Sequence, residues 1–430
     1  MSLSALFARI VAMIGGVMIL LRHRDTSAST PAMGGAPEVP VARAQAIPTL
    51  KMPTAKGWAA GHRPTPAPGL KVNAFATGLD HPRSLEVLPN GDVLTAEACF
   101  LPGGISNPFD YAMYVTMKRA AATGVSPNRV ILLRDADGDG VAETSSVFLE
   151  GLNQPFGLAY LEGKLYLGNV DGLVEYPFTP GPLKLTGKGR KLASFKDGGH
   201  WTRSLILSPD RTKIYVGVGS QSNIADDGME AEEGRARIQE YDIASGTIRP
   251  FATGLRNPVG TAWTPDGALW TVVNERDGLG DETPPDYLTS VQDGGFYGWP
   301  FCYWGKIVDD RVPQDAGLVA RAIQPDYALG GHTASLGLCW MPAGTLPGFG
   351  DGMVIGQHGS WNRSTLSGYR VVFVAFEGGR PVGEARVILD GFLSPDEKFS
   401  YGRPVGVAIK DGALLLADDV GNAIWRVTGA

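Results

Sequence analysis

Residue types that can do chemistry recur just before apolar runs of the sequence. The segment 198–203 places His200 directly after two glycines and ahead of one such run. A neutral imidazole can take a proton from a hydroxyl group near pH 7. His200 is therefore a candidate general base. The alternative is a structural histidine in a turn.

Arginine residues occupy the equivalent positions ahead of other apolar runs. Arg256 stands before Asn257, Arg403 precedes Pro404, and Arg83 follows Pro82. The forked donors of arginine suit carboxylates, and asparagine both donates and accepts hydrogen bonds. If these groups meet, they suit a ligand with several carboxylates. The alternative is that each arginine caps a loop by donating to backbone carbonyls.

An acidic, glycine-rich stretch at residues 274–282 is a candidate metal site. It contains Asp277, Gly278, Asp281 and Glu282. Ca²⁺ takes six to eight oxygen ligands from carboxylates and carbonyls, which this stretch offers. The alternative is a solvated acidic loop.

A second acidic segment resembles the start of an EF-hand loop. Asp135, Asp137 and Asp139 alternate with small residues, but the twelfth position is Ser146 rather than Glu. Apolar strands, not helices, are expected on both sides. We therefore interpret this segment as a hairpin turn, with weak calcium binding as the lesser alternative.

Six copies of one sequence repeat predict the fold. Each copy has a turn residue, an apolar strand, a turn that is usually Asp-Gly or Asn-Gly, and a second apolar strand. The copies begin at residues 82, 155, 202, 258, 334 and 404. Such turns supply the positive φ that a tight β-hairpin requires. Each copy of the repeat is therefore predicted to be a β-hairpin.

The spacing of the hairpins, roughly 60 residues, fits a propeller blade with its outer strands. We expect residues 70–430 to form an all-β, six-bladed β-propeller of four-stranded antiparallel blades. A strand near residues 72–75 is expected to pair with one near 423–427 and close the ring. The alternatives are an array of sandwiches or a seven-bladed ring. Residues 108–122 are the one predicted helix.

The N-terminal region has a different composition. Residues 10–21 are apolar or glycine and are flanked by arginines. This length suits a signal peptide better than a membrane span, which needs about 20 residues. We expect residues 1–26 to be a signal peptide or membrane anchor, with a cleavage candidate at residues 44–46. Residues 27–69 are expected to be a flexible linker, and the protein to be periplasmic or anchored facing the periplasm.

Charge and cysteine content exclude some classes of function. The net charge of −6 over 430 residues implies no basic face, so nucleic-acid binding is not expected. The three cysteines form no metal-binding spacing and allow at most one disulfide.

Four motifs together resemble the glucose/sorbosone dehydrogenase family, and most closely its L-sorbosone dehydrogenase branch. They are residues 198–203, 254–258, 294–300 and 358–364, and the resemblance covers roughly residues 70–429. The resemblance implies a six-bladed propeller that holds pyrroloquinoline quinone (PQQ) and calcium at the channel mouth. PQQ has three carboxylates, which agrees with several arginines at one mouth.

The resemblance also implies roles for individual residues. His200 would be the general base. Arg256, also counted as catalytic, and Asn257 would contact the quinone carbonyls. Cofactor-binding roles extend to Arg403, Arg203 and Arg363. The Asp277–Gly278 loop would supply carbonyl ligands to calcium, with Asp281 and Glu282 nearby.

One departure from the family pattern concerns the group that orients His200. The glucose-oxidising branch has an Asp beside Gln in the loop that here reads Gly219-Ser220-Gln221. The orienting acid is absent or has moved, with Asp226 or Asp227 as candidates.

The expected function is therefore a PQQ-dependent oxidation of an aldose or a sorbosone-like sugar aldehyde. A quinone or a cytochrome would be the electron acceptor. The alternatives are a calcium-dependent, lactonase-like propeller hydrolase and a propeller that only binds a ligand.

Overall fold

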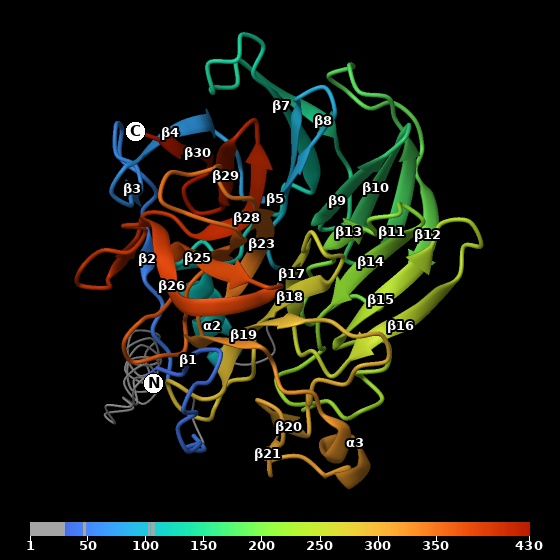
Figure 1. Cartoon of the computed structure of the whole chain (residues 1–430), viewed down its shortest axis with the longest axis vertical. Helices are drawn as coiled ribbons and strands as arrows, with labels where there is room; N and C mark the ends of the chain where they lie inside the picture. The colour runs from blue at the N-terminus through green and yellow to red at the C-terminus, as the bar shows by residue number, and fades with distance from the viewer. Residues whose placement is uncertain (1–30, 46–48, 102–103, 105–107) are drawn as a thin grey trace, which may run out of the picture.

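Six β-sheets follow one another around a ring in chain order (Figure 1). The computed structural model describes residues 31–45, 49–101, 104 and 108–430. In each sheet the first strand lies at the centre of the ring and the fourth near the rim. The predicted six-bladed β-propeller of four-stranded antiparallel blades is confirmed.

The blades are built as follows. Blade 1 contains β5 (Pro82–Val87), β6 (Val93–Glu97), β7 (Arg129–Arg134) and β8 (Thr144–Leu149). Blade 2 contains β9 (Gly157–Leu161), β10 (Lys164–Asn169), β11 (Gly172–Pro177) and β12 (Arg190–Ser194). Blade 3 contains β13 (Leu205–Leu207), β14 (Lys213–Val218), β15 (Arg237–Asp242) and β16 (Ile248–Thr253).

The second half of the ring has the same pattern. Blade 4 contains β17 (Pro258–Trp263), β18 (Leu269–Val273), β19 (Pro285–Ser290) and β22 (Tyr327–Gly331). Blade 5 contains β23 (Ser335–Met341), β24 (Gly352–Gln357), β25 (Arg370–Glu377) and β26 (Arg380–Asp390). Blade 6 contains β28 (Pro404–Lys410), β29 (Ala413–Asp418), β30 (Ala423–Gly429) and β4 (Leu70–Thr77).

Short elements complete the described part of the chain. Its helices are α2 (Pro108–Arg119), which confirms the predicted helix, and α3 (Ala316–Arg321), which was not predicted. The remaining short strands are β1 (Met33–Gly34), β2 (Thr54–Ala55), β3 (Thr65–Pro66), β20 (Cys302–Tyr303), β21 (Ile307–Val308) and β27 (Phe399–Ser400).

The repeated turns have the conformation that their residues predict. Glu162 and Gly163 both have positive φ, at 41° and 86°, and so do Asp411 and Gly412, at 47° and 70°. Positive φ at both central residues is the requirement of a type I′ hairpin turn. These turns join the first and second strands of blades 2 and 6.

Repeated glycines let the inner strands approach one another. A Cβ atom on Gly406 would lie 2.4 Å from the carbonyl oxygen of Arg83 in the next blade. A Cβ atom on Gly157 would lie equally close, at 2.4 Å, to the carbonyl oxygen of Arg203. The side-chain hydrogen of glycine therefore sets how closely neighbouring blades meet at the centre.

The first and last strands close the ring. β4 pairs antiparallel with β30 over residues 70–77 and 423–429, as predicted. Val72 and Phe75 of β4 are buried in blade-to-blade cores, where Phe75 packs beside Ile424. Blade 6 thus joins the N-terminal and C-terminal parts of the propeller.

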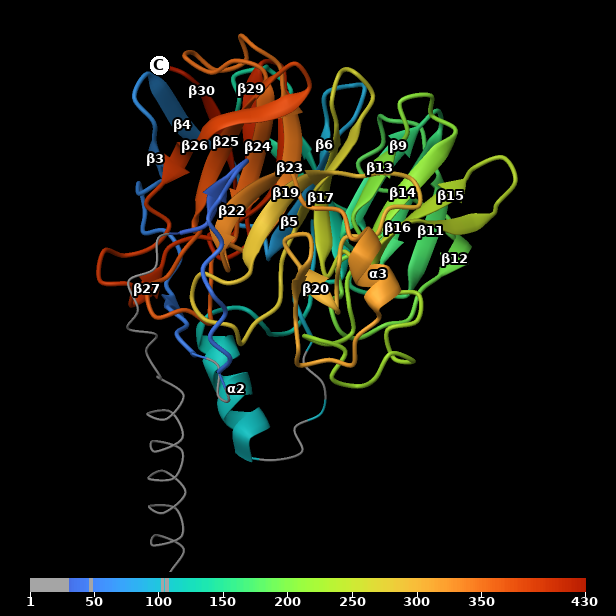
Figure 2. The same ribbon diagram turned by 60° about the horizontal axis from the view of Figure 1, so that its bottom comes forward.

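One face of the ring carries the loops that bear chemistry, and we call it the mouth. It comprises the loops that lead into each first strand and the loops from second to third strands. The paired registers within the blades place all these loops at the same end of the inner strands. In Figure 2 this is the lower side, where α2 and β27 lie.

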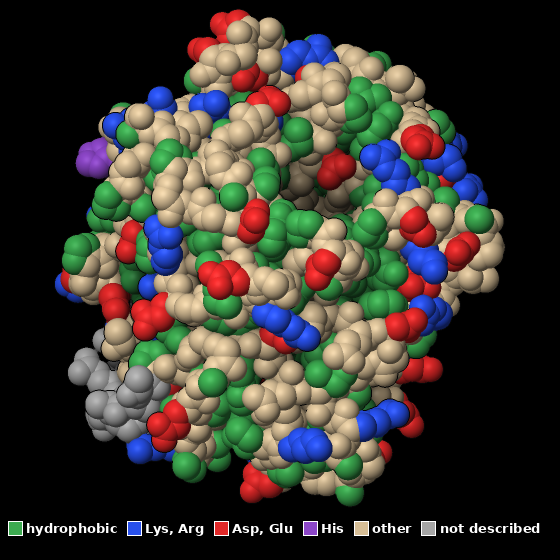
Figure 3. All heavy atoms as spheres, viewed as in Figure 1, with side chains coloured by type: hydrophobic (Ala, Val, Ile, Leu, Met, Phe, Trp, Pro, Cys, Tyr) green, Lys and Arg blue, Asp and Glu red, His purple; other side chains and the backbone are tan. Residues whose placement is uncertain are grey.

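A cavity of about 200 Å³ runs along the centre and is lined by residues of all six first strands, including Glu86, Leu158, Ile206, Thr261, Leu338 and Val407. The space-filling view shows the face opposite the mouth hollowed near its centre (Figure 3). At the mouth end of the strands Phe156, Val259, Leu336 and Val405 pack together.

The N-terminal region differs in part from the expected linker. β1 extends blade 4 by pairing with β22, and β3 extends blade 5 by pairing with β26. The described part of residues 27–69 is therefore docked on the propeller instead of hanging free. The predicted signal peptide or anchor at residues 1–26 lies outside the described residues. Within the part that the structure describes, no helix is long and apolar enough to cross a membrane.

Replacement of Phe75 tests the ring closure. Phe75→Ala is expected to lower the free energy of unfolding by about 3–5 kcal/mol, because it leaves a cavity between two blades. Lys71→Ala, at an exposed position of the same strand, should change it by less than about 0.5 kcal/mol. Urea denaturation followed by circular dichroism compares the two. Equal effects would contradict a closing role for β4.

Candidate functional site

The imidazole of His200 is held by one backbone carbonyl. His200 Nδ1 lies 2.9 Å from the carbonyl oxygen of Ser220, which also accepts the backbone N–H of His200 at 3.0 Å. A carbonyl only accepts, so Nδ1 carries the proton and Nε2 is the basic nitrogen. The Ser220 hydroxyl donates to the carbonyl of Ser222, so it also faces Nδ1 as an acceptor.

The surroundings of His200 keep it neutral. Burial lowers its pKa to about 3, and the positive charges of Arg256 and Arg235 act in the same direction. The Ser220 carbonyl and the charge of Asp277 oppose this only in part. Neither of the candidate acids, Asp226 and Asp227, is a partner of Nδ1, which faces the carbonyl and hydroxyl of Ser220, and Asp226 accepts from backbone N–H groups of its own turn.

Two charged residues fix the loops around His200: Glu232, from the acidic residues at 226–233, and Arg235. Glu232 is buried, and its carboxylate accepts the N–H groups of Gln221 and Ser222. Arg235 donates to the carbonyls of Lys196, Gly198 and others in the loop before His200. The acidic run at 226–233 thus contributes a structural carboxylate to the mouth.

Arg203 has a different place from the one predicted for a cofactor ligand. Its side chain is fully buried and donates to the carbonyls of His200, Thr202 and Lys196. Burial lowers the pKa of Arg203 to about 9, with the neighbouring Arg235 adding to the effect. Arg203 therefore holds the His200 loop from inside and does not face the mouth.

Arg256 is a loop-holding residue that borders His200. Its guanidinium donates to the carbonyls of Asn223, Asn274 and Glu275, and to the side-chain oxygen of Asn223. This matches the alternative in which the arginine caps loops. The Arg256 carbonyl in turn accepts the N–H of Ser220 at 2.7 Å, next to the atom that holds His200.

Asn257 lies beside His200. A Cβ atom on Gly219 would be 2.4 Å from Asn257 Oδ1 and 2.5 Å from His200 Cβ, so only glycine fits between them. Asn257 Oδ1 is buried and has no hydrogen-bond partner among the described residues. A buried, unsatisfied polar atom next to a neutral imidazole marks a place for a polar ligand.

Asp277 connects the His200 side of the mouth to blade 5. Its carboxylate accepts from Asn362, and Oδ1 lies 3.4 Å from His332 Nδ1. Arg256 Nη2 lies 3.9 Å from Oδ2. Burial alone would raise the pKa of Asp277, but the His332 bond and the charge of Arg256 outweigh it and lower the pKa. Asp277 is therefore an ionised carboxylate.

His332 donates to Asp277 and to the carbonyl of Gly280, at 2.9 Å from Nε2. Burial alone would lower the pKa of His332, but its bond to Asp277 and the charge of Asp277 outweigh burial and raise the pKa. Both ring nitrogens then act as donors, as in an imidazolium ion.

A second charged group lies on the other side of the mouth. His358 Nε2 is 2.9 Å from Asp419 Oδ2, which also pairs with Arg83. Burial lowers the pKa of His358 to about 4, with Arg403 acting in the same direction. Arg403 donates to the carbonyls of His358 and Gly359. Asp419 directly follows β29, at the mouth end of a second strand, and this position is the sequence signal that could have found it.

Arg363 has a structural partner in the predicted calcium loop. Its guanidinium pairs with the buried carboxylate of Glu282 and donates to the carbonyl of Asp281 at 2.7 Å. The Asp281 carboxylate accepts the N–H of Ser364 at 3.0 Å. Arg363 therefore holds two loops together and is not placed as a cofactor ligand.

The four predicted calcium ligands do not fit a calcium ion. The carbonyl of Asp277 accepts from Asn223 and from Arg311, and that of Gly278 accepts from Gln45. In the described part of the chain, the three carboxylates predicted as ligands do not lie within 4.8 Å of one another. The guanidinium groups around them would also repel a divalent cation. The loop at 274–282 is thus neutralised by the protein's own cations.

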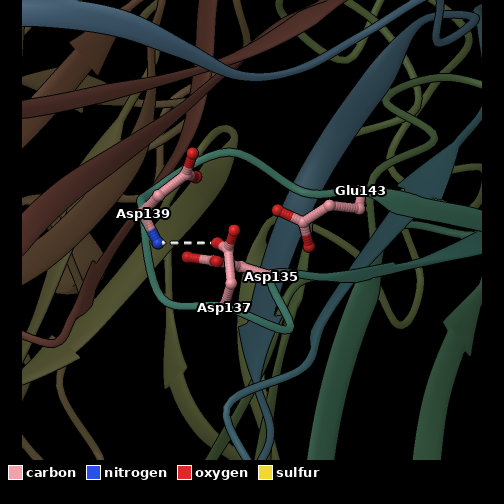
Figure 4. Close-up of side chains that lie close together, drawn as sticks. All are labelled: Asp135, Asp137, Asp139 and Glu143. Atoms are coloured by element: carbon pink, nitrogen blue, oxygen red, sulfur yellow. Dashed lines mark hydrogen bonds between the residues drawn. The ribbon is translucent and has the colours of Figure 1, made fainter.

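A different acidic group is close together, as the sequence pattern indicated. In the β7–β8 hairpin the carboxylates of Asp135, Asp137, Asp139 and Glu143 lie within 4.8 Å of one another (Figure 4). The Asp139 N–H donates to Asp137 Oδ1 at 3.1 Å. The segment is a hairpin turn, as predicted, and it belongs to the face away from the mouth.

The three mouth histidines are expected to titrate separately. His332, with its raised pKa, should protonate above pH 6.5 as pH falls, while His200 and His358 should stay neutral to below pH 5 in the ligand-free protein. Long-range ¹H–¹⁵N spectra of histidine-labelled protein give the protonation states, and single His→Gln variants assign the six histidines. A common titration of all three near pH 6.5 would contradict this electrostatic arrangement.

Replacement of Arg363 separates a structural role from a cofactor-binding role. Arg363→Met is expected to cost about 3–5 kcal/mol of unfolding free energy, because Glu282 is left buried and unpaired. Lys184→Met breaks a pair with Glu150 that is exposed on both sides and should cost about 1 kcal/mol or less. Urea denaturation measures both. If Arg363→Met leaves the free energy of unfolding unchanged, the structural role is wrong and Arg363 is again a candidate ligand-binding residue.

Curated proteins with similar sequences include one from Borreliella burgdorferi, 26% identical over 359 residues, which are 79% of this chain and 90% of that protein. A pyrroloquinoline quinone-dependent pyranose dehydrogenase from Coprinopsis cinerea is 23% identical over 286 residues. These are 55% of this chain, and the match spans only 38% of the length of that enzyme.

Solved structures share the fold. The iodide structure of Trichoderma reesei carbohydrate-active enzyme family AA12 has a TM-score of 0.70 at 22% identity, covering 88% of this chain and 100% of that chain. The holo form of the pyranose dehydrogenase PQQ domain from Coprinopsis cinerea has a TM-score of 0.66 at 20% identity, covering 86% and 98%.

The family model described as TrAA12-like matches residues 64–318, which is more than half of the chain. These matches confirm the expected likeness to sugar dehydrogenases at the level of the family and do not distinguish its sorbosone branch. The chain belongs to the TrAA12-like family.

Proposed function

We propose that this protein is a PQQ-dependent oxidoreductase that oxidises an aldose or a sorbosone-like sugar aldehyde, with His200 as its general base. The family match and the relatives' printed activities support the class of reaction. The geometry of His200 supports the assignment of the base.

The proposal rests on the hydrogen bonding and the protonation state of His200. Its Nδ1 is committed to the Ser220 carbonyl, and its pKa is about 3, so Nε2 is an unprotonated acceptor at neutral pH. The unpartnered Oδ1 of Asn257 lies on the same side of Gly219. A hydroxyl group placed there would have a base for its proton and a polar group to orient it.

The donor set of the mouth fits a polycarboxylate cofactor. Arg83 pairs with Asp419, and the positive charges of Arg403 and Arg83 both act to keep His358 neutral. Arg83 Nε is buried without a partner among the described residues. Arg83 and Arg403 would hold carboxylates of PQQ, and Asn257, which Arg256 precedes in the chain, would meet a quinone oxygen. PQQ, when bound, supplies the acceptor for the hydride.

The arrangement favours a dehydrogenase over the lactonase-like alternative. A calcium-dependent hydrolase of that kind needs carboxylates that converge on a metal at the mouth. Among the described residues, three carboxylates of the mouth each pair with a different cation and do not converge: Asp277 with His332, Glu282 with Arg363, and Asp419 with Arg83.

Replacement of His200 tests the assignment. His200→Asn keeps a side-chain N–H for the Ser220 carbonyl but removes the base. Turnover of sugars with PQQ is expected to fall by about 10²–10⁴-fold, the usual contribution of a positioned base. PQQ affinity, measured by quenching of tryptophan fluorescence, should stay near that of the wild type. His62→Gln, at an exposed position, is the matched control and should retain full turnover.

Three results of this experiment contradict parts of the proposal. If the wild-type protein neither binds PQQ nor reduces a dye with any aldose or sugar aldehyde, the proposed function is wrong. If His200→Asn keeps normal turnover, the base must be sought at His358, which pairs with Asp419. If His200→Asn loses PQQ, His200 is a cofactor ligand and not the base.

A further inference from the structure

The described residues between 31 and 69 form a segment that we call the strap, and it runs along three blades before β4 closes the ring. It adds β1 to blade 4, pairs β2 parallel with β27, and adds β3 to blade 5. Ala32 is buried at 1% exposure. The family model begins at residue 64, so most of the strap precedes the matched region.

The strap first contacts the loop that carries Asp277. The N–H groups of Arg43 and Gln45 donate to the carbonyls of Leu279 and Gly278, each at 2.9 Å. The carbonyl of Pro40 accepts from Thr283 Oγ1 at 3.0 Å. The first two bonds lie within two residues of both Asp277 and Gly280, the two partners of His332, and Thr283 follows Gly280 by three residues.

The second contact is with the loop that carries His358 and Asn362. The backbone N–H of Lys51 donates to the carbonyl of Trp361 at 2.8 Å, and Lys51 Nζ donates to the carbonyl of Ser364 at 2.7 Å. Lys51 also pairs with Glu397. The strap therefore holds the part of this loop around Asn362, whose side chain donates to the Asp277 carboxylate.

The third contact reaches the residue beside Asp419. Trp58 Nε1 donates to Asp418 Oδ2 at 2.7 Å, and Asp418 Oδ1 accepts the N–H of Arg403 at 2.7 Å. The indole of Trp58 packs edge-on against Phe392. One side chain of the strap thus acts on the backbone position of Arg403 through a buried carboxylate.

We propose that the strap is a positioning element of the mouth, which sets the loops of Asp277, His358 and Arg403 relative to one another. Each of its three contacts lies next to a charged group of the mouth. The mature protein must then keep residues 31–45. Cleavage at residues 44–46, which the sequence alone allowed, would remove β1 and the bonds to Gly278 and Leu279.

The test compares the full chain with one that starts at residue 64. The shorter chain keeps β3 and β4, and hence all six four-stranded blades, but loses the three contacts. Its His332 and His358 signals in ¹H–¹⁵N spectra are expected to shift more than that of His200. The strap makes no hydrogen bond to the loops around His200 and acts on them only through the Asp277 loop, so His200 is the internal reference. A general loss of stability would not produce this pattern.

Point variants test the role of the strap if the shorter chain does not fold. Lys51→Met and Trp58→Phe should each shift the His358 signal, and Lys51→Arg should restore it. Lys56→Met is the matched control, because the Lys56 side chain stacks on Phe399 and makes none of the contacts to the Asp277, His358 or Arg403 positions described above. PQQ binding by the shorter chain is expected to weaken, and turnover to drop by about 10²-fold, as for a small misplacement of reacting groups.

The spectra alone decide the proposal, and the PQQ measurements rest on the proposed function. Unchanged His332 and His358 signals in the shorter chain or in both point variants would overturn the role of the strap. If the full chain binds no PQQ while these signals shift as expected, the proposed function fails and the strap's role stands. Recovery of a folded mature protein that begins at residue 47 would also overturn it.

Discussion

Buried guanidinium groups hold the loops of the mouth in place. Loops at the ends of blades lie outside the strand ladders, so their carbonyls need other donors. Arginine offers five donors in a fixed planar fork and can satisfy carbonyls of two loops at once. The residues that do this here are Arg203, Arg235, Arg256, Arg363 and Arg403.

This use of arginine sets the electrostatics of the site. Burial lowers the pKa of both His200 and His358, and the positive charge of Arg256 beside one and of Arg403 beside the other adds to the effect. The same charge favours ionised carboxylates, and the pKa of Asp277 is lowered despite burial. When the carbonyls and carboxylates of a loop already accept hydrogen bonds from cationic side chains, few of their oxygen atoms remain free to coordinate a divalent metal.

The ring depends on contacts at two radii. At the centre, glycines of the first strands bring neighbouring blades into backbone contact. At the rim, β4 completes blade 6, and the strap adds short strands to blades 4 and 5. The inner contacts place the loops around one axis, and the strap then ties three of these loops to one another. The site is thus assembled from both ends of the chain.

Local sequence determined the architecture, since Asp-Gly turns and alternating apolar strands act over a few residues. It therefore predicted six hairpins, the closing pair of strands, α2, and the loops on which His200, Arg256 and Arg403 lie. The partners of those side chains depend on residues far away in the chain. Trp58 meets Asp418 across 360 residues, and Arg363 meets Glu282 across 81. Only the tertiary structure decides whether a guanidinium turns toward a ligand or toward a neighbouring loop, because that choice depends on which carbonyls the folded ring leaves unpaired.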